Sequence, residues 1–201
     1  MLRLYDYLDS GNGYKVRLLL NYLGEPFELI EKDIIAGETR TPEFLARNPN
    51  GRIPVLETGD GAYLPESNAI LFYLADGTRY LPGDRLARAQ MLRWMFFEQN
   101  SHEPNIATSR FWLKHLDIDE TRRTLLEQKK TAGHAALDVM EGHLTDRNWF
   151  VGERATIADI ALYAYTHVAG EGGFDLAAYP AIRAWLDRVA AQPGHITITQ
   201  R

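Results

Sequence analysis

The chain has 201 residues, 24% of them charged, and a formal net charge of -5. This length suffices for one large or two small domains with a sizeable core, and the mild acidity argues against nucleic acid as the main partner. The absence of cysteine excludes disulfides, thiolate metal sites and a cysteine nucleophile. No apolar run is long enough to cross a bilayer, and the first residues lack the apolar core of a signal peptide. We therefore expect a cytoplasmic protein.

The first part of the chain alternates strands and helices. Residues 2–5 alternate apolar and polar side chains, as a short strand does. A turn is expected over 9–13, and a helix over 14–23 that ends at Gly24. A second strand over 27–31 and a short helix over 41–45 follow. In this order the first two strands should be parallel and joined by a right-handed crossover.

Residues 48–57 read N-P-N-G-R-I-P-V-L-E and form the most informative stretch. Asn-Pro and Asn-Gly are turn formers, so a loop ends where a strand begins at Val55. Asp60-Gly61 then predicts a hairpin turn with a returning strand over 62–64. Pro54 opens a strand, where it cannot donate to a ladder, and its bond to Ile53 is a candidate for the cis form. The backbone N–H and C=O of Ile53 could then pair with a peptide-like ligand.

Pro65-Glu66-Ser67 opens an apolar helical run directly after the hairpin. Glu66 and Ser67 therefore lie where unpaired helix N–H groups favour an anion. A backbone pair beside an anion site indicates a pocket for a short anionic peptide. The alternative interpretation is that Pro54 only closes a turn and Ser67 only caps a helix.

The second part of the chain is helical almost throughout. Helices are predicted over 86–116, with a kink at Pro104, and over 125–144. A third helix should follow the T-I-A-D capping box at 156–159, and a last one should cover 181–191. The six histidines show no metal-binding spacing, so no metal is expected. The sequence thus predicts an α/β plus all-α protein. Its parts are a thioredoxin-like domain over 1–76, a linker over 77–85 and a helical bundle domain over 86–201.

Two groups of motifs resemble the cytosolic glutathione transferase family. N-P-x-G-R-I-P-V-L and P-E-S-x-A-I-x-x-Y-L resemble its glutathione-binding half, while G-E-x-x-T-I-A-D and Y-P-x-I-x-x-W-L-x-R resemble its helical half. The resemblance implies that Ile53, before a cis-Pro54, pairs with the cysteinyl backbone of glutathione. It also implies that Glu66 and Ser67 hold the γ-glutamyl end. Arg52 stands where some members bind the glycyl carboxylate, or it is a solvated surface residue.

A glutathione transferase must hold the sulfur of glutathione as a thiolate, and a hydrogen-bond donor aimed at the sulfur lowers the thiol pKa. In serine- and cysteine-type members the catalytic residue occupies the turn that carries Ser10 here, which could instead be an ordinary N-cap. Asn12 could share this role, as in some bacterial members, or fill a left-handed turn position. Tyr7 stands where tyrosine-type members carry their donor, or it forms a pocket wall.

The resemblance implies an enzyme that transfers glutathione, its co-substrate, to small electrophiles, as in detoxification. Glutathione-dependent reduction of disulfides or peroxides, and non-catalytic ligand binding, are the alternatives. The acceptor pocket is expected between the domains, near Asn105, Arg110, Phe111 and Trp112, although Trp112 could equally be core.

The family also implies a homodimer. Apolar residues around the junction of the two domains exceed the obvious needs of a small core, and they could form the interface or be internal: Phe72, Tyr73, Tyr80, Leu86, Met91, Trp94 and Met95.

Overall fold

The computed structural model describes all 201 residues, which form two compact units. One comprises Met1–Leu81 with Pro193–Arg201, and the other comprises Pro82–Gln192. Residues 193–201 were predicted to belong to the helical domain, whereas in the structure they belong to the first unit. The reason is a set of hydrogen bonds from the first helix: Tyr14 Oη donates to the Ile196 carbonyl at 2.6 Å, and Arg17 Nη2 donates to the Ile198 carbonyl at 2.9 Å.

The first unit has a mixed sheet of four strands in the order β2-β1-β3-β4. In chain order its elements are β1 (Leu2–Asp6), α1 (Gly11–Leu23), β2 (Phe27–Glu31), a 3-10 turn (Glu38–Arg40), α2 (Pro42–Arg47), β3 (Val55–Glu57), β4 (Tyr63–Pro65) and α3 (Ser67–Ala75). β1 and β2 are parallel, and the other two pairings are antiparallel. This confirms the thioredoxin-like arrangement.

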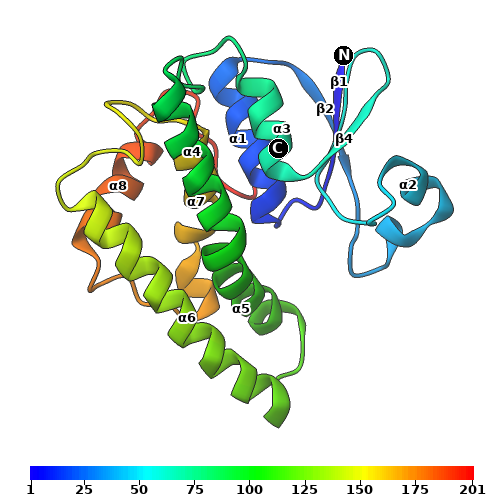
Figure 1. The fold of residues 1–201 in the computed structure, drawn as a ribbon. Helices are drawn as coiled ribbons and strands as arrows, with labels where there is room; N and C mark the ends of the chain where they lie inside the picture. The colour runs from blue at the N-terminus through cyan, green and yellow to red at the C-terminus, as the bar shows by residue number, and fades with distance from the viewer. The chain divides into compact units, whose positions relative to one another are not determined.

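Helices cover both faces of this sheet, with α1 and α3 side by side on one face and α2 on the other (Figure 1). Successive side chains of a strand point to opposite faces of the sheet, so each strand contributes residues to both faces. Leu4 and Leu56 point toward α1 and α3, while Tyr5 and Val55 point toward Phe44 of α2. Each face therefore has its own apolar core, and the loops at the strand ends are left to form a site.

α1 begins at Gly11, so the prediction of a turn over 9–13 and a helix from residue 14 was wrong at this point. Ser10 is the N-cap, with φ -77°, and its hydroxyl accepts the N–H of Gly13 at 3.4 Å. A Cβ on Gly13 would lie 1.6 Å from the Asp6 carboxylate. This glycine is needed because α1 approaches β1 closely, and not because a turn requires it.

The second unit is all helical. Its elements are α4 (Arg85–Phe97), a π-helical turn (Glu98–His102), α5 (Glu103–His115), α6 (Glu120–Leu144), α7 (Ile157–Thr166), a 3-10 turn (Ala169–Gly172) and α8 (Pro180–Ala190). The π-helical turn interrupts the long helix directly before Pro104, as expected of a residue that has no N–H and whose ring clashes with the preceding turn. α6 starts earlier than predicted because Asp119 accepts the N–H of Arg122 at 2.7 Å and caps it.

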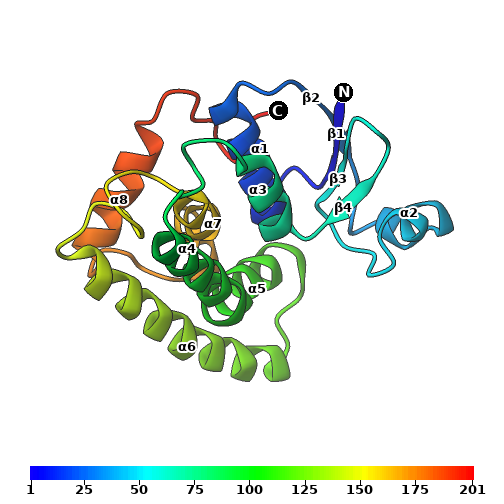
Figure 2. The same cartoon turned by 45° about the horizontal axis from the view of Figure 1, so that its top comes forward.

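The centre of the helical unit is α7, and all ten of its residues are buried. Figure 2 shows it end-on between α4 and α8. The predicted capping box is present: the Thr156 hydroxyl accepts a helix N–H, and the Asp159 carboxylate accepts the N–H of Thr156 at 2.8 Å. No helix of the structure has both the length and the apolar character that a membrane crossing requires.

Four of the residues considered for a dimer interface are internal core. Of the two alternatives given for these residues, the internal one holds for Tyr80, Met91, Trp94 and Met95, which are buried within the chain. The other three, Phe72, Tyr73 and Leu86, are exposed.

Candidate functional site

The loop before β3 presents an unsatisfied stretch of backbone. The peptide bond between Ile53 and Pro54 is cis. Asn48 fixes the loop from behind, because its Nδ2 donates to the Arg52 carbonyl at 2.8 Å and its Oδ1 accepts the N–H of Asn50 at 3.0 Å. Neither the N–H nor the C=O of Ile53 hydrogen-bonds within the chain. Both groups are therefore available to a ligand, and the Arg52 side chain beside them is exposed.

The start of α3 lacks the side-chain cap that an ordinary helix start has. Glu66 occupies the N-cap position, yet its side chain makes no capping hydrogen bond. Its φ of 72° makes it the one non-glycine residue with a positive φ. A non-glycine residue in such a conformation costs about 1–3 kcal/mol, and these residues cluster at ligand clamps. The uncapped N–H groups of the first turn remain for an anion, with the largely buried Ser67 next to them.

Asn12 connects the start of α1 to the start of α3. It lies in the first turn of α1, which rules out the left-handed turn position considered for it. Its Oδ1 accepts the Ser67 hydroxyl at 3.3 Å and the Lys15 ammonium at 2.8 Å. Two of the predicted site residues, Asn12 and Ser67, are thus in direct contact, and Ser10 is the cap of the same helix.

Sequence reasoning missed Lys15, whose side chain is fully buried. Its Nζ donates to Ser67 Oγ at 3.4 Å in addition to Asn12. One signal was available in the helical spacing. Lys15 lies three and four residues before Leu18 and Leu19, so it occupies the buried face of the predicted helix.

The segment from Asp6 to Ser10 is held by a buried ion pair that was also missed. Arg17 Nε donates to Asp6 Oδ2 at 2.9 Å, and both side chains are fully buried. Burial raises the pKa of the Asp6 carboxyl, and the Arg17 guanidinium opposes that shift. Arg17 Nη2 also donates to the Leu8 carbonyl at 2.6 Å, and the Tyr7 carbonyl accepts the N–H of Ser10 at 2.8 Å. These bonds fix the turn that presents Ser10.

The residues expected around the acceptor all belong to α5, and several have partners inside the helical unit. Arg110 is largely buried, and its Nε lies 2.8 Å from Glu171 Oε2. The Asn105 side chain donates to the Ser101 carbonyl at 2.7 Å. Phe111 and Trp112 are half-buried, so Trp112 is not a core residue. Their assignment to an acceptor pocket stays a prediction.

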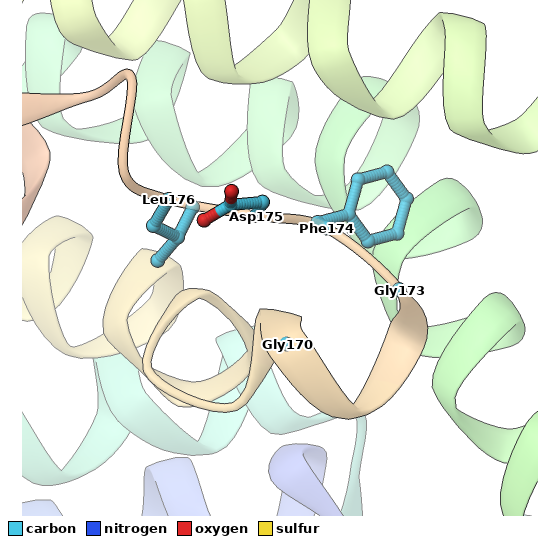
Figure 3. A pocket seen from close by; sticks show the side chains of 5 residues that line it. All are labelled: Gly170, Gly173, Phe174, Asp175 and Leu176. Atoms are coloured by element: carbon cyan, nitrogen blue, oxygen red, sulfur yellow. The ribbon is translucent and has the colours of Figure 1, made fainter.

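The helical unit also has an open hollow of about 540 Å³, lined by Gly170, Gly173, Phe174, Asp175 and Leu176. Figure 3 shows the last three on the segment that follows Gly173. The Asp175 carboxylate accepts the N–H of Ala177 at 2.8 Å, which is a local turn. No other titratable group lines the hollow, and none of the predicted site residues does. No group of His, Asp or Glu is arranged to hold a metal ion.

A thioredoxin-like unit with a cis-proline loop, followed by an all-helical unit, defines the glutathione transferase class of fold. Residues 1–76 match the family model "Glutathione S-transferase, N-terminal domain", and residues 100–193 match "Glutathione S-transferase, C-terminal domain". The chain belongs to the glutathione S-transferase family.

Similar proteins include both solved structures and curated relatives. A glutathione S-transferase from Pseudomonas fluorescens is 52% identical, has a TM-score of 0.97 and covers 99% of either chain. The glutathione transferase URE2P8 from Phanerochaete chrysosporium, solved with oxidized glutathione, is 27% identical with a TM-score of 0.86 over 96% of this chain and 90% of that one.

The curated relatives have different activities. A maleylacetoacetate isomerase from Rhizobium meliloti is 35% identical over 94% of this chain and 90% of its own length. The disulfide-bond oxidoreductase YfcG from Escherichia coli is 30% identical over 96% and 92%. Family membership therefore supports the use of glutathione, while the activity itself has to be argued from the site.

Proposed function

We propose that the thioredoxin-like unit binds glutathione and activates its sulfur as a thiolate, which attacks an electrophilic small molecule. The observation that carries this proposal is the contact between the two helix starts, where Asn12 Oδ1 accepts the Ser67 hydroxyl at 3.3 Å. It joins an anion site on α3 to a hydrogen-bonding turn on α1, and the unpaired backbone of Ile53 belongs to the same unit.

Each part of glutathione has a chemically suited partner in this arrangement. The γ-glutamyl carboxylate fits the N–H groups at the start of α3 and the Ser67 hydroxyl, and its ammonium group fits the Glu66 carboxylate. The cysteinyl backbone pairs with the N–H and C=O of Ile53, as an added strand would. The exposed Arg52 guanidinium suits the glycyl carboxylate.

The sulfur of glutathione would then accept hydrogen bonds from the donors at the start of α1. The Ser10 oxygen accepts the N–H of Gly13, and its own O–H proton remains a donor for the sulfur. Capping and thiol activation are therefore compatible roles for Ser10. The thiol releases its proton to water, the thiolate forms a C–S bond with the electrophilic carbon, and the leaving group departs with the electron pair of the bond it held.

A second candidate, reduction of disulfides, is favoured by the similarity to the disulfide-bond oxidoreductase YfcG. Here the glutathione thiolate attacks one sulfur of a disulfide and releases the other as a thiolate. A second glutathione attacks the mixed disulfide, which releases the second thiol and oxidized glutathione. This sequence needs no protein thiol, so the absence of cysteine does not exclude it.

Calorimetric titration with glutathione, followed by assays against a panel of electrophiles and disulfides, tests the proposal. We expect one glutathione per chain and turnover of at least one class of acceptor. Turnover of disulfides alone would select the second candidate, and binding without turnover would select a carrier. Absence of glutathione binding would contradict both enzymatic functions.

A further inference from the structure

Lys15 is a buried cation directly beneath the candidate site. The side chain is fully buried, and its Nζ lies 2.8 Å from Asn12 Oδ1 and 3.4 Å from Ser67 Oγ. Burying an ammonium group costs several kcal/mol unless it is paired and hydrogen-bonded. A methionine would fill the same volume without this cost, so the charge itself calls for an explanation.

The ammonium group determines which way the Asn12 amide faces. Lys15 can only donate hydrogen bonds, so the Asn12 atom that contacts it must be the carbonyl oxygen. A flipped amide would bring its NH2 group against the NH3⁺ group, donor against donor. The NH2 of Asn12 is therefore directed away from Lys15, and the contact with Ser67 falls on the same oxygen.

We propose that Lys15 is a positioning residue for thiol activation, an inference that rests on the proposed function. It holds the Asn12 amide so that the NH2 group donates to the sulfur of bound glutathione. Its own buried positive charge adds to the stabilisation of the thiolate. By donating to Ser67 Oγ at 3.4 Å it also holds the Ser67 hydroxyl at the start of α3.

A merely structural role, as a strut between α1 and α3, leads to a different expectation. Loss of a strut would lower the free energy of unfolding and weaken glutathione binding, but it would not change the acidity of a thiol that is bound at saturation. The pKa of the bound thiol is therefore the decisive quantity.

The test uses the full-length chain with Lys15→Met, which nearly keeps the volume of the side chain and removes its charge and its donors. Lys32→Met is the matched control, since Lys32 follows β2 in the same unit and is not part of the Asn12–Lys15–Ser67 cluster. Calorimetry establishes the saturating concentration of glutathione for each protein, and thiolate absorbance is then titrated against pH. We expect Lys15→Met to raise the thiol pKa by about one unit, a roughly tenfold loss of thiolate near neutral pH, and Lys32→Met to leave it unchanged.

Asn12→Asp serves as a second variant, and decides the matter if Lys15→Met does not fold. It retains a partner for the Lys15 ammonium but replaces the NH2 donor by a carboxylate oxygen, so the thiol pKa should rise at least as far. A titration curve of Lys15→Met, or of Asn12→Asp where Lys15→Met does not fold, that superimposes on the wild-type curve would overturn the positioning role and leave the proposed function intact. A wild-type protein that binds no glutathione would overturn both.

Discussion

The conformation of Glu66 links local strain to ligand binding. With a φ of 72°, an L side chain pays a steric cost that glycine does not. We expect Glu66→Gly and Glu66→Ala to weaken glutathione binding to a similar extent, because both remove the carboxylate. The glycine variant should nevertheless be about 1 kcal/mol more stable than the alanine variant. Calorimetry and urea unfolding measure the two effects, and equal stability of the variants would show that the position is unstrained.

The residues that sequence reasoning identified and those that it missed differ in one physical respect. Ile53, Glu66 and Ser67 stand in turn and helix-start patterns that are local, so their placement follows from their neighbours. Lys15 and Asp6 gain their roles from burial, which depends on how α1 packs against β1 and α3. A charged side chain is expected at the surface, and only the finished packing reveals that these two are enclosed.

Two glycines of α6 should respond in opposite ways to the same substitution. A Cβ on Gly133 would come within 2.4 Å of the Phe174 ring, whereas nothing lies within 4 Å of a Cβ on Gly142. Alanine is the better helix former by about 1 kcal/mol. We expect Gly142→Ala to stabilise the protein by up to that amount, and Gly133→Ala to destabilise it by about 1–3 kcal/mol because of overpacking. Thermal unfolding of the pair is the measurement, and stabilisation by Gly133→Ala would contradict the packing.

The carboxylate that caps α7 should impose a pH dependence on stability. Asp159 is fully buried and accepts the N–H of Thr156, the N–H of Phe150 and the indole N–H of Trp185. Burial raises its pKa from 3.8 to about 6. Because the folded state then binds the proton more tightly than the unfolded state, the contribution of Asp159 is full below about pH 4 and declines as the pH rises through about 6.

Asp159→Asn isolates this contribution. The unfolding free energy of the wild type minus that of the variant should fall by about 3 kcal/mol from roughly pH 4 to pH 7. Urea unfolding at a series of pH values provides the difference. A difference that grows with pH would mean that the three donors outweigh burial and depress the pKa.

The spacing of apolar and polar residues predicted every strand and every major helix, whereas packing determines where these elements begin and end. The T-I-A-D capping box fixed the start of α7 because both partners lie within one turn. The start of α1 could not be obtained in this way: Gly11-Asn12-Gly13 has the composition of a turn. The segment is helical because Ser10 caps it, and Gly13 is a glycine because a Cβ there would clash with the Asp6 carboxylate.

For the whole molecule, we propose that two copies associate as a homodimer. Phe72 and Tyr73 on α3 and Leu86 on α4 are large apolar side chains that remain 37%, 51% and 66% exposed. Burying such residues against a second copy is favourable by the hydrophobic effect. We expect sedimentation at micromolar concentration to give twice the mass of the chain and Tyr73→Glu to weaken the association, with Ile35→Glu, at an exposed position in the loop after β2, as the control. A monomeric wild type would contradict the proposal.

The fold class of the whole chain was predictable because its two sets of motifs are long and lie in the expected order. The assignment of the last residues was not. Residues 193–201 have no helical periodicity, and they belong to the first unit because Tyr14 and Arg17 hold their carbonyl groups. Such long-range hydrogen bonds leave no pattern in the local sequence.

We propose that the turn after β1 activates the thiol of glutathione, with Ser10 as the main donor. A charge-assisted hydrogen bond contributes about 1.5–3 kcal/mol, so Ser10→Ala should lower turnover near neutral pH by roughly ten- to hundredfold. Asn12→Ala should cause a smaller defect of the same kind, and Tyr7→Phe should leave the thiol pKa nearly unchanged.

The most direct measurement is the thiolate absorbance of enzyme-bound glutathione, titrated against pH for the wild type and these three variants at saturation. We expect the curve of Ser10→Ala to shift to higher pH and part of the lost activity to return as the pH is raised. A curve that shifts in Tyr7→Phe and stays in place in Ser10→Ala would contradict the role of Ser10 and identify a tyrosine-type enzyme.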